Sequence, residues 1–157
     1  MAPKRIIKGP NALVGTFTAR LAYDVPSRRL FVSAITNNPD SSRSARIVVF
    51  DDQANGDVAP LRTIAGAATG LELPGTSFID GLAIDPERQR LIVSIADFSV
   101  TANNKILMFA LTDNGNLAPL QTIAGARNRV CQPAWARRSG CRVIPFSAKA
   151  SNKRRFG

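Results

Sequence analysis

Outside the C-terminal region, the side chains of this sequence that could form a reactive or metal-binding site are mainly aspartate and asparagine. The sequence contains no histidine, which excludes Ser-His-Asp and Cys-His catalysis and histidine-ligated metals. Its two cysteines, Cys131 and Cys141, both lie near the C-terminal end. Carboxylate and amide oxygens remain, and they are the ligands that Ca²⁺ and Mg²⁺ prefer. The candidates for such a site are Asp80, Asp97, Asn103 and Asn104, together with Asn37, Asn38 and Asp40 earlier in the chain.

The same residues are also common turn formers, because Asn and Asp side chains hydrogen-bond to their own local backbone. A cation site and a set of ordinary turns are therefore both open interpretations. No phosphate-binding loop is present, since the small segment GAATG at 66–70 precedes no expected helix. We expect no catalytic residue and no cofactor, with Ca²⁺ or Mg²⁺ as the metal candidates.

The positive charge of the chain is concentrated towards its C-terminus. The formal net charge is +10, from 21 Lys or Arg and 11 Asp or Glu residues. Nine of the basic residues and none of the acidic ones lie in 127–157, so the preceding part is nearly neutral. This tail has three aromatic residues for stacking on bases and no RNA or DNA motif. We therefore expect no specific nucleic-acid partner.

No segment of the sequence predicts a membrane span or an export signal. The apolar runs fall far short of the roughly 18 residues that cross a bilayer. The basic residues Lys4, Arg5 and Lys8 precede a stretch that Gly9 and Pro10 interrupt, which lacks the continuous apolar core of a signal peptide. The localisation is therefore not encoded in the chain.

An internal repeat predicts the architecture. The phrase APLRTIAG at 59–66 returns as APLQTIAG at 118–125, and a partial copy, PKRIIKG, occupies 3–9. We therefore expect the N-terminus to be the closing strand of a preceding unit. The match between the two complete units extends upstream through two stretches, 47–67 with 106–126 and 21–33 with 82–94.

Each unit contains four short apolar runs rich in Val, Ile, Leu, Phe and Thr, which favour strands. Runs such as Leu91-Ile92-Val93 are apolar on consecutive residues, so both faces of each sheet should be buried. Asn-Gly at 55–56 and 114–115 predicts type I′ hairpin turns. The expected strands are 18–24, 29–35, 46–52 and 59–65 in the first unit, and 78–85, 90–96, 105–111 and 118–124 in the second.

Repeated four-stranded antiparallel meanders, buried on both faces, indicate β-propeller blades. A β-sandwich needs no sequence repeat, and a β-solenoid has a shorter one. The phrases APLRTIAG and GLAID, in that order with RLIVS, resemble bacterial NHL and beta-propeller lactonase-like repeats. This resemblance covers residues 3–126. It implies an exported parent protein, a ligand-binding face formed by loops, and, in some lactonase-like propellers, a bound cation.

We divide the chain into four segments and expect an all-β fold of blades in an incomplete propeller. Such a piece is either part of a longer protein or self-associates through its exposed blade faces, for example as a trimer with six blades. The segments are 1–17, a closing strand and linker; 18–66, the first blade; 67–125, the second blade; and 126–157, a basic tail.

The tail departs from the repeat, and two explanations are open. Gln132-Pro133 lies where the repeat expects proline, but the Gly-Leu-Ala-Ile-Asp opener that should follow is missing. The segment Trp135-Ala136-Arg137-Arg138 follows instead, after a linker shorter than the one between Pro74 and Gly81. Codons that encode Trp-Ala-Arg-Arg can encode Gly-Leu-Ala-Val when read one nucleotide later. The tail is therefore either frameshifted or a native, solvated basic segment, and the gene sequence decides between them.

The functional expectation is a non-catalytic scaffold that binds a protein or a small molecule on its loop face. The alternative is a remnant of a lactonase-like propeller hydrolase with an Asp/Asn site for a divalent cation. An enzyme site should break the repeat by placing acidic residues where the other unit has none. The two units are mostly alike, which favours the scaffold.

Overall fold

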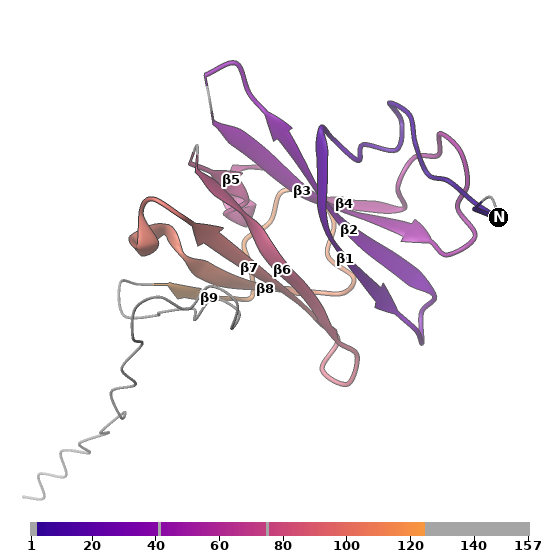
Figure 1. Cartoon of the computed structure of the whole chain (residues 1–157). Helices are drawn as coiled ribbons and strands as arrows, with labels where there is room; N and C mark the ends of the chain where they lie inside the picture. The colour runs from indigo at the N-terminus through magenta and orange to yellow at the C-terminus, as the bar shows by residue number, and fades with distance from the viewer. Residues whose placement is uncertain (1–2, 41, 75, 125–157) are drawn as a thin grey trace, which may run out of the picture.

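The computed structural model describes residues 3–40, 42–74 and 76–124, and strands dominate this part of the chain (Figure 1). The all-β prediction is therefore confirmed. The tail 126–157, with its cysteines and its frameshift hypothesis, lies outside the described residues. The strands are β1 (Phe17–Asp24), β2 (Arg29–Asn37), β3 (Arg43–Asp51), β4 (Arg62–Ile64), β5 (Glu72–Leu73), β6 (Ser77–Asp85), β7 (Arg90–Asp97), β8 (Lys105–Ala110) and β9 (Gln121–Ala124).

The strands form two antiparallel sheets in which neighbours along the chain are neighbours in space. Sheet 1 has the order β1-β2-β3-β4, with β5 also paired to β3, and sheet 2 has the order β6-β7-β8-β9. Two short 3₁₀ turns, η1 (Ala67–Thr69) and η2 (Thr101–Asn103), complete the described elements. In the same residues, no helix has the length and apolar character needed to cross a bilayer.

The two sheets have matching registers. Leu30 of β2 pairs with Phe50 of β3, and Leu91 of β7 pairs with Phe109 of β8. The closing strands β4 and β9 begin three residues later than expected, after Pro60 and Pro119, because proline has no N–H to donate to a neighbouring strand.

The main core lies between the sheets, where their inner faces meet. In sheet 1 the inner face includes Phe31, Ile47 and Val49, and in sheet 2 it includes Leu91 and Phe109. All of these side chains are fully buried. The first strands of the two sheets, β1 and β6, lie side by side where the sheets meet in the centre of the molecule (Figure 1).

The outer face of sheet 1 is covered in part by the N-terminal segment. Val32, Val48 and Phe50 form a second buried cluster, against which Ile7 and Val14 pack. Consecutive residues of β2 and β3 are therefore buried on both faces of sheet 1, as the apolar runs predict.

The outer face of sheet 2 contradicts the same prediction. Along β7 the burial alternates, so that Leu91 and Val93 are buried while Ile92 is only half-buried. Ile106 and Met108 of β8 are half-buried in the same way. The physical reason is that no element in the described part of the chain packs on this face.

The Asn-Gly pairs do not form the predicted type I′ hairpins. That turn needs positive φ at both residues, but only the glycines, Gly56 at 78° and Gly115 at 87°, have it. Each asparagine instead accepts a backbone N–H from the preceding closing segment. Asn55 Oδ1 accepts from Ile6 N at 3.0 Å, and Asn114 Oδ1 accepts from Thr63 N at 2.9 Å.

These contacts form a junction that occurs twice. Ile7 makes a parallel bridge with Gly56, and Ile64 of β4 makes the same bridge with Gly115. Gly56 N donates to the carbonyl of Ile6, and Gly115 N donates to that of Thr63, both at 2.7 Å. The N-terminal segment therefore bonds to the Asn55-Gly56 turn of sheet 1 in the same way as β4 bonds to the Asn114-Gly115 turn of sheet 2.

Candidate functional site

The most highly connected carboxylate of the described residues is Asp97, the last residue of β7. It directly precedes the loop that joins β7 to β8, and its exposed fraction is 4%. Because β7 pairs with β6 up to its end, Ser77 of β6 is opposite Asp97. The end of one strand and the start of its neighbour thus place hydroxyl groups beside this carboxylate.

Both oxygens of Asp97 accept hydrogen bonds from the protein itself. Oδ1 accepts from the Thr76 hydroxyl at 2.7 Å and from the backbone N–H groups of Ser99 and Val100 at 2.8 and 2.9 Å. Oδ2 accepts from the Ser77 hydroxyl and from Asn103 Nδ2, both at 2.8 Å. Each donor favours the ionised form, so these bonds, with that from Asn103 foremost, hold the pKa of the Asp97 carboxyl well below its usual range.

This arrangement makes Asp97 a centre that organises its loop. With five donors already on its two oxygens, the carboxylate has little acceptor capacity left for a ligand. No group of three or more His, Cys, Asp or Glu side chains that could hold a metal ion occurs in the ranges that the structure describes. The local geometry therefore favours the turn-former interpretation of these residues over a cation site.

The four candidates of the second unit are not all brought together. Asn103 and Asn104 both contact Asp97, since Asn104 Oδ1 accepts from the backbone N–H of Asp97 at 2.7 Å. Asp80 lies apart, at the register shift between Ile79 and Gly81. Its Oδ1 is 3.1 Å from Nη2 of Arg20 on β1, in an ion pair between partly exposed side chains.

The candidates of the first unit form a separate polar cluster in the loop between β2 and β3. Asn38 Nδ2 donates to the hydroxyls of Ser42 and Ser44, both at 2.9 Å. The hydroxyl and N–H of Ser42 donate to Asp40, which lowers the pKa of that carboxyl. Asn37 is the exposed last residue of β2. Like Asp97, Asn38 and Asp40 hydrogen-bond to residues of their own loop and its flanks.

Arg43 of β3 connects the loop ends of the two sheets. Its Nη1 donates to the carbonyl of Ser77 at 3.2 Å, beside the Asp97 cluster. The two loop regions therefore lie at the same end of the molecule, which we term the loop face.

Sequence reasoning missed the side chains that the loop face presents outward. Phe98 follows Asp97 and is 72% exposed. Its ring stacks on that of Phe78 with the centroids 4.6 Å apart. An apolar residue directly after the loop-organising aspartate was the signal available in the sequence, and Val100 is exposed beside it. Exposed apolar side chains of this kind can bind a ligand, but they have no groups that could catalyse a reaction.

The far end of sheet 1 carries a second carboxylate centre. Asp52 accepts from Arg28 Nε and from the Tyr23 hydroxyl, each at 3.0 Å. The bond from Arg28 is the foremost reason that the pKa of Asp52 is lowered to about 2. These groups are partly exposed, and they connect the β1–β2 turn to the end of β3.

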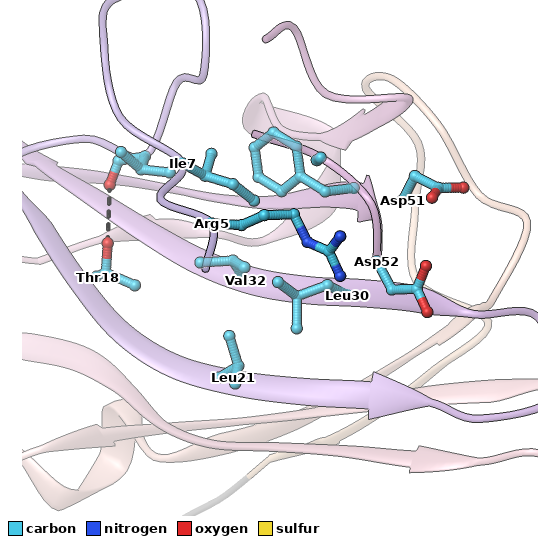
Figure 2. Close-up of a pocket in the computed structure, with 11 residues that line it drawn as sticks. Arg5, Ile7, Thr18, Leu21, Leu30, Val32, Asp51 and Asp52 are labelled. Atoms are coloured by element: carbon cyan, nitrogen blue, oxygen red, sulfur yellow. Dashed lines mark hydrogen bonds between the residues drawn. The ribbon is translucent and has the colours of Figure 1, made fainter. Parts of the chain in front are cut away.

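A groove of about 360 Å³ adjoins this end, on the outer face of sheet 1. Figure 2 shows Leu21, Leu30 and Val32 along its floor, with Arg5 and Ile7 of the N-terminal segment beside it. Arg5 Nη1 donates to Gln53 Oε1 at 2.7 Å. The groove is apolar at its base and charged at its rim.

Comparison of the chain with protein-family models, with curated proteins and with solved structures finds no match.

Proposed function

We propose that this chain is a non-catalytic scaffold made of β-propeller-type blades, part of a longer or self-associated propeller, that binds a protein or a small molecule on its loop face. Two observations support the blade arrangement. Both sheets contain a four-stranded meander, β1 to β4 in sheet 1 beside the short β5, and β6 to β9 in sheet 2. The inner face of one sheet packs on the inner face of the other. Such packing of successive sheets is what blades require.

The saturated Asp97 carboxylate carries the proposal. A catalytic base or a cation ligand needs a lone pair directed at its substrate or ion. Asp97 instead accepts three hydrogen bonds from its own loop, at Ser99, Val100 and Asn103. The other two come from Thr76 and Ser77 at the start of β6. The carboxylate therefore fixes the loop in place, and the loop presents Phe98 and Val100 to solvent.

One observation favours the hydrolase alternative. By the offset of the repeat, Asp97 occupies the position that Thr36 has in the first unit, so an acidic residue breaks the repeat there. A cation-dependent hydrolase would use Asp97 with Asn103 and Asn104. It would first have to replace the hydrogen bonds that these groups make to one another and to the loop.

Thermal unfolding with and without divalent cations separates the two functions. The scaffold predicts the same melting temperature, within about 1 °C, in EDTA and in millimolar Ca²⁺ or Mg²⁺. The hydrolase predicts a rise that the Asp97→Asn variant loses and the matched Asp80→Asn variant keeps. That pattern, or hydrolysis of a simple lactone that depends on Asp97, would overturn the proposal.

The binding role needs a test of its own. Small aromatic and aliphatic fragments are titrated into the labelled protein and followed by amide NMR shifts. We expect shifts concentrated at the amides of Phe98, Ser99 and Val100, which Phe98→Ser reduces. Shifts confined to other surfaces would contradict binding at the loop face.

A further inference from the structure

The outer faces of the two sheets match the two faces that meet in the core. In the described part of the chain, the N-terminal segment covers the outer face of sheet 1 only in part, and no element packs on that of sheet 2. By the offset of the repeat, Leu30, Val32 and Phe50 on the outer face of sheet 1 correspond to three inner-face residues of sheet 2, Leu91, Val93 and Phe109. The residue types are identical at all three positions. The outer face of sheet 1 therefore has the side chains that, in sheet 2, pack against a neighbouring sheet.

The outer face of sheet 2 carries the other half of the same contact. Ile92, Ile106 and Met108 correspond to Phe31, Ile47 and Val49, which are fully buried in the core between the sheets. All three residues of sheet 2 are only half-buried. The chain thus contains one complete version of an apolar interface, in its core, and the two separate halves of a second version on its outer faces.

Within residues 3–124, as far as they are described, the edge of β9 that faces away from β8 pairs with no other strand. In the first unit, β4 lies between β3 and the Asn114-Gly115 turn, and it exchanges backbone hydrogen bonds with Gly115. In the second unit, β9 pairs with β8, and all of its residues are exposed. Thr122 and Ala124 correspond to Thr63 and Ala65, whose backbone groups bond to Gly115.

We propose that a second copy of this chain docks head to tail, with its sheet 1 outer face on the sheet 2 outer face of the first copy. The contact continues the packing that already joins the two sheets within one chain. Ile92 and Met108 of one copy then cover the groove at Leu21, Leu30 and Val32 of the other. Because the two surfaces differ, the association is heterologous and extends to a ring or a filament.

In the copy whose sheet 1 is contacted, the N-terminal segment must be displaced from the turn at Gly56. Residues 5–8 occupy, beside Gly56, the position that β9 of the first copy requires. The exchange conserves the two backbone hydrogen bonds to Gly56, because Thr122 and Ala124 offer the carbonyl and the N–H that Ile6 and Lys8 provide within one copy. The net gain is therefore the apolar area that docking removes from water beyond what the N-terminal segment already covers, chiefly at Leu21 of one copy and at Ile92 and Met108 of the other.

The test begins with the mass of the full chain in solution. Sedimentation velocity and light scattering are run from about 1 to 200 µM, with a reductant so that Cys131 and Cys141 cannot link copies. We expect assemblies of two or more chains that grow with concentration and persist at high salt, because the contact is apolar. A monomer across this whole range would overturn the proposal.

Two substitutions then separate the two faces. Met108→Glu places a charge on the outer face of sheet 2, and Leu21→Glu places one in the groove on sheet 1, where Leu21 is 60% exposed. Each variant alone should be monomeric, with association weakened at least tenfold. Ile123→Glu, at the edge of sheet 2, repeats the first test with less demand on folding. Val25→Glu, at a 70% exposed turn position, is the control that should still associate.

Mixing the two variants gives the decisive result. Met108→Glu keeps an intact sheet 1 face, and Leu21→Glu keeps an intact sheet 2 face. A head-to-tail contact therefore predicts that the mixture forms a one-to-one dimer and nothing larger. Two variants that stay monomeric when mixed, or that associate separately as the wild type does, would overturn the proposal. Because the loop face takes no part, this result is independent of the cation and fragment experiments.

Discussion

Gly66 lies so close to Asn116 that a Cβ atom on residue 66 would stand 2.6 Å from the Cγ atom of that asparagine. The two residues are close because the end of the first unit bonds to the turn at Gly115 in the second unit. Asn116 Oδ1 accepts from the backbone N–H of Ala68 at 2.8 Å, just after Gly66. Gly9 stands against Asp57 in the same way, and Asp57 Oδ1 accepts from Asn11 N at 2.8 Å.

We expect Gly66→Ala to destabilise the fold by about 2 kcal/mol. Residue 66 has a φ of 112°, which side chains rarely adopt, and its new methyl group would overlap Asn116. Gly56→Ala is the control, because Gly56 has a positive φ but no atom within 4 Å of its Cβ position. That variant should lose only about 1 kcal/mol. Equal losses in urea unfolding would mean that contact with Asn116 has no cost.

The same repeat position should have opposite importance in the two units. Ile64 is 1% exposed in the core, whereas its counterpart Ile123 is 36% exposed on β9. We expect Ile64→Ala to cost about 3 kcal/mol, because it leaves a cavity, and Ile123→Ala to cost less than about 1 kcal/mol. Urea unfolding at low protein concentration measures both. A similar cost for the two would show that β9 is buried in the monomer.

The repeat predicted most of the fold because each strand could be assigned from two corresponding segments of the sequence. Each of the eight expected runs overlaps an observed strand. The strand β5 could not be predicted, since Glu72 and Leu73 form it only by pairing with Ser44 and Arg43. Two residues are too few to show a period. Their strand character comes from a distant partner and not from local sequence.

The candidate site was predicted less well, for two physical reasons. Asp80 was grouped with Asp97, Asn103 and Asn104 as a candidate for one site, but it lies at the register shift between Ile79 and Gly81, where it pairs with Arg20. A bulge of this kind leaves no signal in the residue types. The Asn-Gly pairs misled because Asn55 and Asn114 have partners about 50 residues away in the chain, which a local turn rule does not consider.

Asp97→Asn should destabilise the protein although it removes only a charge. The new amide places N–H groups where Oδ1 or Oδ2 accepted hydrogen bonds, so donors face donors at a buried site. We expect the melting temperature to fall by roughly 5 °C, with exchange of the Ser99 and Val100 amides accelerated. Asp80→Asn is the matched control and should shift the melting temperature little, because its ion pair with Arg20 is partly exposed. An unchanged melting temperature for Asp97→Asn would contradict the role of this carboxylate in the loop.

Acid should unfold the wild-type protein more steeply than the Asp97→Asn variant. The hydrogen bonds led by that from Asn103 hold the pKa of Asp97 below its ordinary value, and Arg28 lowers that of Asp52 to about 2. Between the folded and unfolded pKa values the unfolded chain binds more protons, so lowering the pH favours unfolding. The contributions of both carboxylates are complete above a pH of about 5 and are lost as the pH falls from there through their folded pKa values. In Asp97→Asn the contribution of Asp97 is absent, while those of Asp52 and Asp40 remain. The urea midpoint should therefore fall less between neutral pH and a pH of about 2. Parallel midpoint curves for the two proteins would show that Asp97 titrates normally in the folded state.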